Sequence, residues 1–377
     1  MQPRATDVLI IGGGLAGLCS AIHLSKAGFE VILIEKSSYP KHKVCGEYIS
    51  NEVLPYLEFL GIDVFAEGAK HITKFKLTTT TNKTITANLP LGGFGMSRYA
   101  LDALLAEKAK QNGSTILQDM VTNVQFKTNK FSVTTKNEHT YSSKIVIAAF
   151  GKRSNLDVNL NRDFIQHKSP YLGVKMHVKG NFPEDLVALH NFKGGYCGLS
   201  KVETNAINLC YITTFNAFKK FKDIETFQKE VLFKNRALKE IFENTTPVFE
   251  APLTISQISF ETKAPVEGHM LMCGDAAGMI HPLCGNGMGM AIRSAQMASE
   301  LSTAYLENKI NTRKALETQY IEQWNTNFKN RLRLGHTIAA IFRNDTLAVL
   351  MLGVLKIFPW LLPIIIKQTH GKLMQVK

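Results

Sequence analysis

The fold is decided by residues 7–17, which read DVLIIGGGLAG. The short aliphatic run in this stretch is typical of a buried parallel strand, and three glycines follow it at once. The next residues, 18–27, predict a helix that ends at Gly28. A second aliphatic run, residues 30–35, ends in Glu35. A strand, a GxGxxG turn, a helix and a second strand ending in an acid together predict a dinucleotide-binding unit.

Each glycine of the GxGxxG motif is needed for a mechanical reason. Gly12 permits the tight turn, Gly14 lets the backbone approach a pyrophosphate, and Gly17 lets the helix pack against the strand. The helix N-terminus offers free N–H groups and a partial positive charge to the phosphates. Glu35 can accept hydrogen bonds from both ribose hydroxyls and would repel a 2′-phosphate, so the ligand is FAD or NAD and not NADP. The cofactor-binding set also includes the flanking residues Leu15, Ala16 and Lys36.

A second motif lies far along the chain, where residues 270–278, MLMCGDAAG, predict a strand that runs into a Gly274-Asp275 turn. Asp275 could hold a hydroxyl of a ribityl chain. A loop from residue 282 and a helix rich in small residues follow. The residues Gly285, Gly287 and Met288 of this loop would direct backbone N–H groups and a positive helix end at one spot. Because a reduced flavin carries negative charge at its N1 and C2 oxygen, this arrangement favours FAD as the dinucleotide.

These motifs resemble the flavoprotein superfamily that contains the aromatic-ring hydroxylases, the geranylgeranyl reductases and the flavin halogenases. The matching segments are residues 12–17 with Glu35, 43–47 (KVCGE), Ser97-Arg98 with Asp102, 150–154 (FGKRS) and 274–289. The resemblance implies an α/β fold with a Rossmann-like FAD-binding domain, an antiparallel β-sheet substrate domain and a helical C-terminal region. It does not fix the reaction.

The resemblance also assigns residues to the cofactor. Arg98 would reach the FAD pyrophosphate or adjoining groups, and the less favoured alternative is a solvated side chain at the start of a helix over residues 99–111. Cys45 and Gly46 would lie near the flavin, and Cys45 would then face the active site unless it is a buried, inert thiol. Val121 completes the cofactor-binding set.

Three side chains are candidates for catalysis. Besides Cys45, they are Tyr196 and His281. Tyr196 lies in a segment where geranylgeranyl reductases have an aromatic-rich substrate strand. His281 lies beside the loop of residues 282–289, which we call the flavin loop. Tyr196 could instead be a core aromatic, and His281 a hydrogen-bonded structural histidine rather than a proton donor. The six cysteines are dispersed without metal-ligand spacing, so we expect no metal site and a reducing, cytoplasmic environment.

The sequence departs from the superfamily pattern in three places. Phe150-Gly151 stands where hydroxylases carry an Asp-Gly pair, which puts direct use of NAD(P)H in doubt and leaves a small redox carrier as the other electron donor. No second GxGxxG follows, so a separate nicotinamide domain is not expected. The only tryptophans are Trp324 and Trp360, and no lysine-containing halogenase motif is present, which argues against halogenation.

The predicted domains are discontinuous. The FAD-binding domain takes residues 1–68, 92–165 and 262–335, the substrate domain takes 69–91 and 166–261, and an apolar helical region takes 336–377. Within the substrate domain, strands are predicted at 74–80, 171–178, 195–201 and 205–213, with a helix at 223–235. That helix carries Ile224, Phe227, Val231 and Leu232 on one face, where we expect them to serve only in packing.

The C-terminal region has an apolar run, residues 346–366, in which Lys356 is the one charged residue. A bilayer core needs about 20 apolar residues, but Pro359 and Pro363 interrupt this run. Three interpretations compete: a helical cap over a substrate cavity, a monotopic membrane-contact patch and a transmembrane anchor. The lysines at 356, 367, 372 and 377 and the net charge of +13 would suit an anionic surface, and no nucleic-acid motif is present.

These features predict an FAD-dependent oxidoreductase that acts on a lipophilic, prenyl or lipid-like substrate by hydride transfer, as in geranylgeranyl reductases. One alternative is a monooxygenase that hydroxylates a lipid-tailed phenol or quinone precursor. The other is a non-enzymatic, membrane-associated flavoprotein. We expect a cytoplasmic protein that could lie on the inner face of a membrane, and the sequence leaves the oligomeric state open.

Overall fold

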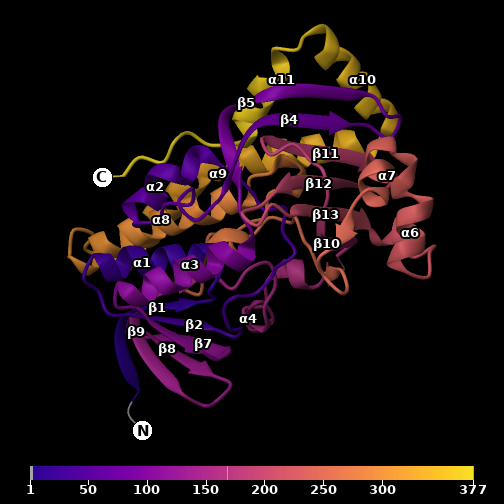
Figure 1. The fold of residues 1–377 in the computed structure, drawn as a ribbon. Helices are drawn as coiled ribbons and strands as arrows, with labels where there is room; N and C mark the ends of the chain where they lie inside the picture. Colours follow the sequence, from indigo (N-terminus) through magenta and orange to yellow (C-terminus); the bar gives the residue numbers. More distant parts are fainter. Residues whose placement is uncertain (1–2, 168, 377) are drawn as a thin grey trace.

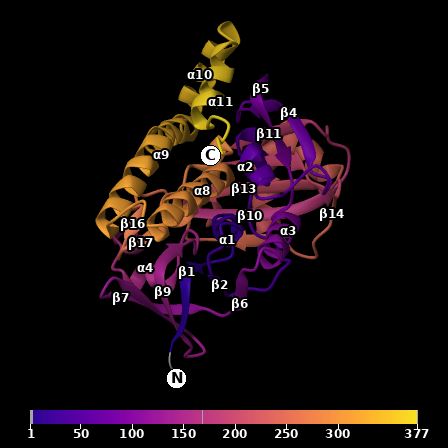
Figure 2. The same ribbon diagram turned by 90° about the vertical axis from the view of Figure 1, so that its left-hand side faces the viewer.

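The computed structural model describes residues 3–167 and 169–376. Two β-sheets organise these described residues, one at the bottom of Figure 1 and one at its upper right, and helices cover faces of both. The C-terminal helices lie beyond the second sheet (Figures 1 and 2). The predicted class, an α/β fold with a parallel dinucleotide-binding sheet, a largely antiparallel second sheet and a helical C-terminal region, is confirmed.

The first sheet has a parallel centre in the order β17-β9-β1-β2-β6. Its strands are β1 (Arg4–Ile11), β2 (Val31–Glu35), β6 (Thr115–Gln118), β7 (Val121–Lys127), β8 (Lys130–Thr135), β9 (Thr140–Ala148), β16 (Val266–Glu267) and β17 (Met270–Met272). The last residue of β1, Ile11, pairs with Ile34 on one side and Ala148 on the other. The glycine turn after β1 therefore lies at the carboxyl edge of the sheet, where open α/β sheets bind their ligands.

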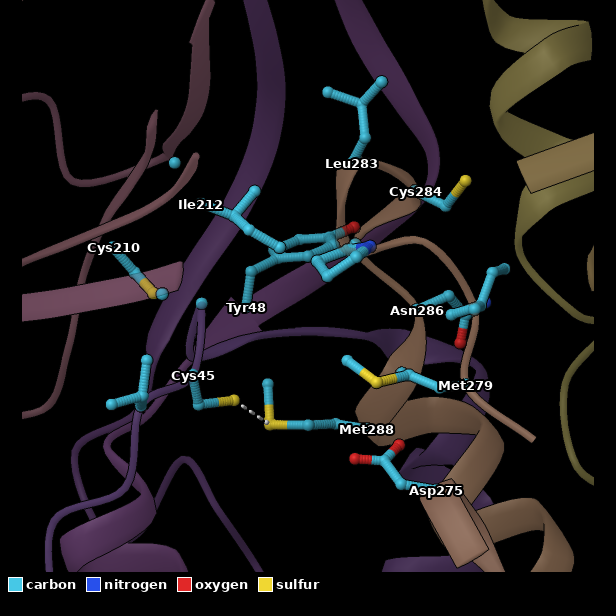
Figure 3. A pocket seen from close by; sticks show the side chains of 18 of the residues that line it. Cys45, Tyr48, Cys210, Ile212, Asp275, Met279, Leu283, Cys284, Asn286 and Met288 are labelled. Carbon is cyan, nitrogen blue, oxygen red and sulfur yellow. Dashed lines mark hydrogen bonds between the residues drawn. The ribbon is translucent and has the colours of Figure 1, made fainter. Parts of the chain in front are cut away.

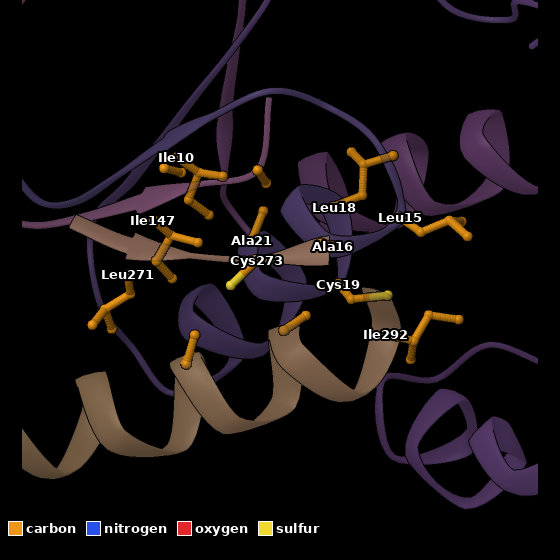
Figure 4. Close-up of a cluster of buried hydrophobic side chains, with 14 of the residues drawn as sticks. Ile10, Leu15, Ala16, Leu18, Cys19, Ala21, Ile147, Leu271, Cys273 and Ile292 are labelled. Carbon is orange, nitrogen blue, oxygen red and sulfur yellow. The ribbon is translucent and has the colours of Figure 1, made fainter. Parts of the chain in front are cut away.

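Helices pack on this sheet and form the main core. They are α1 (Leu15–Lys26), α2 (Leu54–Phe59), α3 (Arg98–Gln111), α4 (Asn155–Asn159), α8 (Gly287–Leu306) and α9 (Arg313–Arg343). Helix α1 lies against both β1 and α8, and in Figure 4 the buried side chains of Ile10, Ile147 and Leu271 on three strands gather with Ile292 of α8. The core thus fixes the N-termini of α1 and α8 relative to one sheet edge.

The second sheet is antiparallel except where β4 pairs with β11 in parallel. Its strands are β3 (Tyr48–Ser50), β4 (Lys70–Thr78), β5 (Thr84–Gly95), β10 (Tyr171–Lys179), β11 (Leu186–Phe192), β12 (Gly195–Lys201), β13 (Ile207–Thr214), β14 (Thr246–Pro247) and β15 (Leu253–Ile255). The predicted strand at 195–201 is confirmed residue for residue as β12, and the other three predicted strands have shifted ends. Three short helices, α5 (Phe215–Phe218), α6 (Ile224–Glu230) and α7 (Arg236–Glu243), follow β13.

The predicted helix at 223–235 is shorter than expected. Helix α6 ends at Glu230, and a 3₁₀ turn takes Leu232–Lys234. The next helix has a local start, because the side chain of Asn235 accepts hydrogen bonds from the backbone N–H groups of Ala237 and Leu238 and caps α7. The packing role is confirmed, since Phe227 and Leu232 are fully buried in the core of the second sheet.

The apolar C-terminal run forms two helices, α10 (Asp345–Ile357) and α11 (Leu361–Thr369), with Pro359 in the connection. Their inner side chains Leu352, Leu355, Leu362 and Ile366 pack with residues of β4 and β5. Among the described residues, no single helix is both long enough and apolar enough to cross a membrane, although α9 and α10 would pass that test together despite a bend of 110° between them.

Candidate active site

A cavity of about 910 Å³ runs from the carboxyl edge of the first sheet to the C-terminal helices. At one end its wall contains most of the residues that the sequence assigned to the cofactor, namely Gly12, Gly14, Leu15, Ala16, Glu35, Lys36, Cys45, Gly46, Arg98, Gly274, Asp275, Gly285, Gly287 and Met288. Gly17 and Val121 do not line it. Gly17 packs under the turn and Val121 is buried in the main core, so a cofactor contact by Val121 stays a prediction.

The three glycines of the GxGxxG motif are required for different physical reasons. A Cβ atom on Gly12, which has φ of +101°, would lie 2.5 Å from the carbonyl oxygen of Ala149, and one on Gly17 would lie 1.9 Å from that of Gly12. These two glycines are required by packing of the protein itself. A Cβ atom on Gly14 would meet only the Arg98 guanidinium, at 3.7 Å, so Gly14 faces the open cavity. Gly14 is therefore the position where a ligand, and not the protein, requires glycine.

Glu35 is held at the end of β2 by two backbone donors. The N–H of Gly13 donates to its Oε2 at 2.7 Å, and the N–H of Ser37 donates to its Oε1 at 2.9 Å. The Tyr39 hydroxyl donates to the carbonyl of Gly13 at 2.7 Å and supports the same turn. The carboxylate is thus fixed in the cavity wall, with lone pairs left for the hydroxyls of a ribose.

Arg98 is oriented by a buried carboxylate. Its Nε and Nη2 donate to Oδ1 and Oδ2 of Asp102 at 2.7 and 2.9 Å, and Lys43 donates to Oδ2 at 2.7 Å. Burial alone would raise the pKa of Asp102, but the charges of Arg98 and Lys43 outweigh it and hold the pKa below its ordinary value. The Arg98 side chain is only 13% exposed, so it is a fixed cation beside Gly14 and not a solvated side chain.

The opposite wall comes from the Gly274-Asp275 turn and the N-terminus of α8. Burial raises the pKa of Asp275, while the nearby Lys263 and Lys152 favour its charged form. A Cβ atom on Gly287 would meet no protein atom within 4 Å, so the first turn of α8 presents bare backbone to the cavity. The N-terminus of this 20-residue helix has no side-chain cap, and its partial positive charge favours negative charge at this point.

Comparison with known families decides what this site holds. The model of a family described as an FAD binding domain matches residues 5–310. The chain belongs to this FAD-binding domain family. Its cofactor is FAD, and the open backbone at Gly14, the fixed Glu35 and the α8 N-terminus fit the pyrophosphate, the ribose and the flavin of that molecule. The chain is therefore an FAD-dependent oxidoreductase.

The curated proteins that are similar to this chain have names that refer to several activities. The chain is 24% identical to digeranylgeranylglycerophospholipid reductase of Methanococcus vannielii, over 84% of this chain and 82% of the relative. It is also 24% identical to chloroplastic geranylgeranyl diphosphate reductase of Arabidopsis thaliana, over 91% and 75%. The FAD-dependent monooxygenase atnA of Arthrinium sp is 26% identical, but the match covers only 45% of that protein.

Solved structures show that the fold is shared. The flavin-dependent brominase Bmp2 superposes with a TM-score of 0.80 at 18% identity, over 97% of this chain and 93% of the brominase. A geranylgeranyl bacteriochlorophyll reductase-like protein of Thermoplasma acidophilum gives a TM-score of 0.73 at 17% identity, over 91% and 90%. At these identities the likeness concerns the fold alone.

The three candidate catalytic residues of this family member lie in different settings. Cys45 lines the cavity, and Figure 3 shows its thiol facing Met288, with 3.4 Å between the two sulfur atoms. Tyr196 also lines the cavity, whereas His281 does not. The His281 ring packs among aromatic rings, including that of Tyr196 with centroids 6.1 Å apart, and burial lowers its pKa to about 4. His281 is thus neutral at pH 7, and its role as a proton donor stays a prediction.

Three polar residues in the wall were not among the predicted cofactor-binding or catalytic residues. They are Tyr48, Asn286 and His370, and the Tyr48 hydroxyl, the Asn286 Oδ1 and the His370 Nε2 are buried without a hydrogen-bond partner among the described residues. Tyr48 follows the matched KVCGE segment directly, which was an available signal. His370 is far from the flavin loop along the sequence, in the C-terminal region, and no sequence pattern connected the two. No group of three or more histidine, cysteine or acidic side chains among the described residues could hold a metal ion.

A buried ion cluster joins the cofactor side of the site to the second sheet. Glu47, which is fully buried, accepts hydrogen bonds from Lys175 and His177 of β10 and from the backbone N–H of Arg98, the last at 2.7 Å. Burial alone would raise the pKa of Glu47, but the hydrogen bond from His177 and the charge of Lys175 hold it below its ordinary value. Glu47 therefore connects both walls of the cavity.

We expect Glu47→Gln to destabilise the protein by about 3 to 5 kcal/mol at pH 7, because it leaves the buried Lys175 cation without a counter-charge. Since the pKa of Glu47 is depressed in the folded state, its contribution is present above the ordinary value of 4.5 and is lost as the pH falls below it. The wild-type protein should thus lose stability below about pH 4.5, and the variant should lose less. Urea unfolding at a series of pH values measures both effects.

The matched control is Glu225→Gln, which removes an exposed carboxylate from an ion pair with Lys229 on α6. Exposed pairs contribute little to stability, so this variant should unfold like the wild type at every pH. A Glu47→Gln protein with an unchanged urea midpoint would show that the cluster does not hold the two walls together.

Proposed function

We propose that this flavoprotein is a reductase or dehydrogenase that transfers hydride between FAD and a prenyl or lipid-like substrate. The observation that carries the proposal is the second half of the cavity, which continues past the flavin loop between the second sheet and the C-terminal helices. Its wall is almost entirely apolar and includes Phe75, Leu77, Val187, Leu189, Phe342 and Leu355. A long apolar cavity that begins at a flavin fits a long hydrocarbon chain.

The relatives support the same substrate class. The two reductases that match over most of this chain have names that refer to geranylgeranyl groups, which are long, branched hydrocarbons. At 24% identity, these names support a long hydrocarbon substrate only in combination with the apolar wall of the cavity.

The polar atoms in the wall complement the apolar half. The ring Nδ1 of His370 lies 2.9 Å from the carbonyl of Ile366, which accepts its proton, so Nε2 is left as an acceptor. Asn286 donates through Nδ2 to the carbonyl of Thr369 at 3.0 Å, which fixes its Oδ1 as a second acceptor. The Tyr48 hydroxyl can donate or accept. Each of these atoms is buried within the wall, so the polar end of a substrate would reach one of them only as neighbouring side chains move.

The chemistry is divided between cofactor and protein. When bound, FAD supplies hydride transfer. The apolar wall excludes water from the reacting carbon, the fixed Arg98 and Glu35 hold the cofactor, and the N-terminus of α8 stabilises negative charge near Gly287. No residue in the wall needs to act as a nucleophile for this reaction.

The test is an anaerobic half-reaction. The FAD-loaded protein is reduced chemically without oxygen and mixed with a geranylgeranyl lipid, and the flavin absorbance is followed while the lipid is analysed by mass spectrometry. Return of the oxidised flavin spectrum together with a lipid that has gained two hydrogens, one as hydride from the flavin and one as a proton, supports the proposal. A flavin that stays reduced until oxygen is admitted, with an oxygen atom then added to the substrate, would instead establish the monooxygenase alternative.

A further inference from the structure

The hairpin of α10 and α11 exposes an unusual amount of apolar surface. Leu350, Ile357 and Trp360 are 64%, 72% and 60% exposed. Leu347, Val354, Phe358 and Ile364 are exposed beside them. Figure 2 shows α10 projecting beyond the rest of the described chain, and the exposed fractions show that the described residues leave these side chains uncovered. A continuous apolar face of this kind marks an interaction surface.

The exposure is not a sign of loose packing. Leu352, Leu355 and Leu362, on the inner side of the same hairpin, are at most 5% exposed and pack on the second sheet. The chain after α11 is also tied to the protein body, since Met374 donates to the backbone carbonyl of Glu52 at 2.9 Å and Gln296 donates to that of Gln375 at 2.7 Å. The hairpin is therefore held in place with apolar side chains on both faces.

Beyond Asp345, the first residue of α10, the charged side chains of this region have one sign. Between residues 346 and 376 there is no aspartate or glutamate, and the lysines at 356, 367 and 372 are all exposed. Pairing two copies of this face about a twofold axis would bring the like-charged lysines of the copies together. An anionic lipid surface offers apolar chains to the leucines, isoleucines and Trp360, and negative headgroups to the lysines.

We propose that the exposed face of α10 and α11 is a docking surface for an anionic lipid bilayer. The two helices lie in the headgroup region, with Leu350, Ile357 and Trp360 in the acyl chains and Lys356 and Lys367 at the phosphates. Met351 and Leu355 of α10 and Ile365 of α11 line the cavity from the other side. If the proposed function holds, only this single layer of helices separates a lipophilic substrate in the bilayer from the flavin site.

The fluorescence of an intrinsic tryptophan can report this contact. Of the protein's two tryptophans, Trp324 is 3% exposed in the core, whereas Trp360 is 60% exposed on the proposed surface. Addition of vesicles of phosphatidylcholine and phosphatidylglycerol should shift the tryptophan emission to shorter wavelength, and brominated lipids should quench it. Vesicles of phosphatidylcholine alone should have a much weaker effect, because the lysines then find no counter-charge.

Variants test the two components separately by vesicle co-sedimentation of the FAD-loaded protein. Ile357→Glu should weaken binding by on the order of tenfold or more, since it replaces an inserted apolar side chain by a charge. Lys356→Glu with Lys367→Glu should reduce it by roughly fivefold for each lost lysine contact, and only on anionic vesicles. The matched control is Val158→Glu on α4, a position that is 52% exposed and far from the hairpin, which should bind as the wild type does.

Two outcomes would overturn the proposal. One is an Ile357→Glu protein that sediments with anionic vesicles as well as the wild type. The other is a wild-type dimer that Leu350→Glu dissociates, which would make this face a contact between copies. Because bound flavin and anaerobic turnover of a detergent-dispersed lipid are measured in the same preparations, loss of vesicle binding with turnover intact separates this proposal from the proposed function.

Discussion

Gly14→Val protein is expected to fold and to purify without its yellow colour. The backbone of Gly14 is extended, with φ of −87° and ψ of −171°, which a β-branched residue adopts without strain. A side chain there would occupy the space that the structure leaves for the pyrophosphate. We expect FAD affinity to fall by about a thousandfold, equivalent to two charge-assisted hydrogen bonds of about 2 kcal/mol each. Flavin absorbance per polypeptide and titration with FAD measure the loss.

Gly17→Ala is the contrasting variant. Its Cβ would lie 1.9 Å from the carbonyl oxygen of Gly12, so the helix could not keep its place against the strand. We expect a loss of more than about 4 kcal/mol in the free energy of unfolding, because backbone atoms must move. A Gly14→Val protein that keeps a full complement of FAD would contradict the cofactor position derived from the open backbone.

Tyr48→Phe is expected to change stability and activity in opposite directions. The Tyr48 hydroxyl is buried in the cavity wall without a partner among the described residues, so its removal should stabilise the protein without substrate by about 1 kcal/mol. If the hydroxyl binds the polar end of the substrate, its loss should lower kcat/KM by about tenfold to a hundredfold. Thermal unfolding and anaerobic flavin reoxidation by the geranylgeranyl lipid measure the two effects.

Tyr56→Phe supplies the control for this prediction. Tyr56 is also fully buried, but its hydroxyl is paired with Nδ1 of His23 at 2.9 Å, away from the cavity. Removing this hydroxyl should destabilise the protein by about 1 kcal/mol and leave kcat/KM unchanged. Equal effects of the two variants on kcat/KM would show that Tyr48 acts only through the packing of its ring.

The sequence predicted those parts of the fold that depend on local physics. The turn after β1 needs glycines, and a parallel strand buried on both faces needs an unbroken aliphatic run, so residues 7–35 could be interpreted without other information. The helix predicted at 223–235 shows the limit of periodicity, since α6 ends at Glu230 although the apolar face runs on to Leu232.

The rest of the site depends on contacts between distant segments. Lys175 and His177 meet Glu47 only because β10 passes beside the 43–47 segment in the folded chain. The sequence of β10 by itself gives no sign of a buried ion pair. His370 reaches the flavin loop because the C-terminal end of α11, at Thr369, lies against Asn286. Neither pairing has a spacing that a sequence pattern could detect.

One feature of the cavity wall bears on how the enzyme tolerates air. Cys45 and Met288 touch through their sulfur atoms, and Figure 3 shows Met279, Cys210 and Cys284 around the same space. A reduced flavin that meets dissolved oxygen without using it releases hydrogen peroxide, which converts thioethers to sulfoxides and thiolates to sulfenic acids. The first targets of that peroxide are the thioethers of Met279 and Met288, because burial raises the pKa of the Cys210 and Cys284 thiols to about 12 and disfavours their reactive thiolates. Uncoupled turnover would therefore inactivate this enzyme from within, and methionine sulfoxide reductase would be able to restore only the thioether part of the damage.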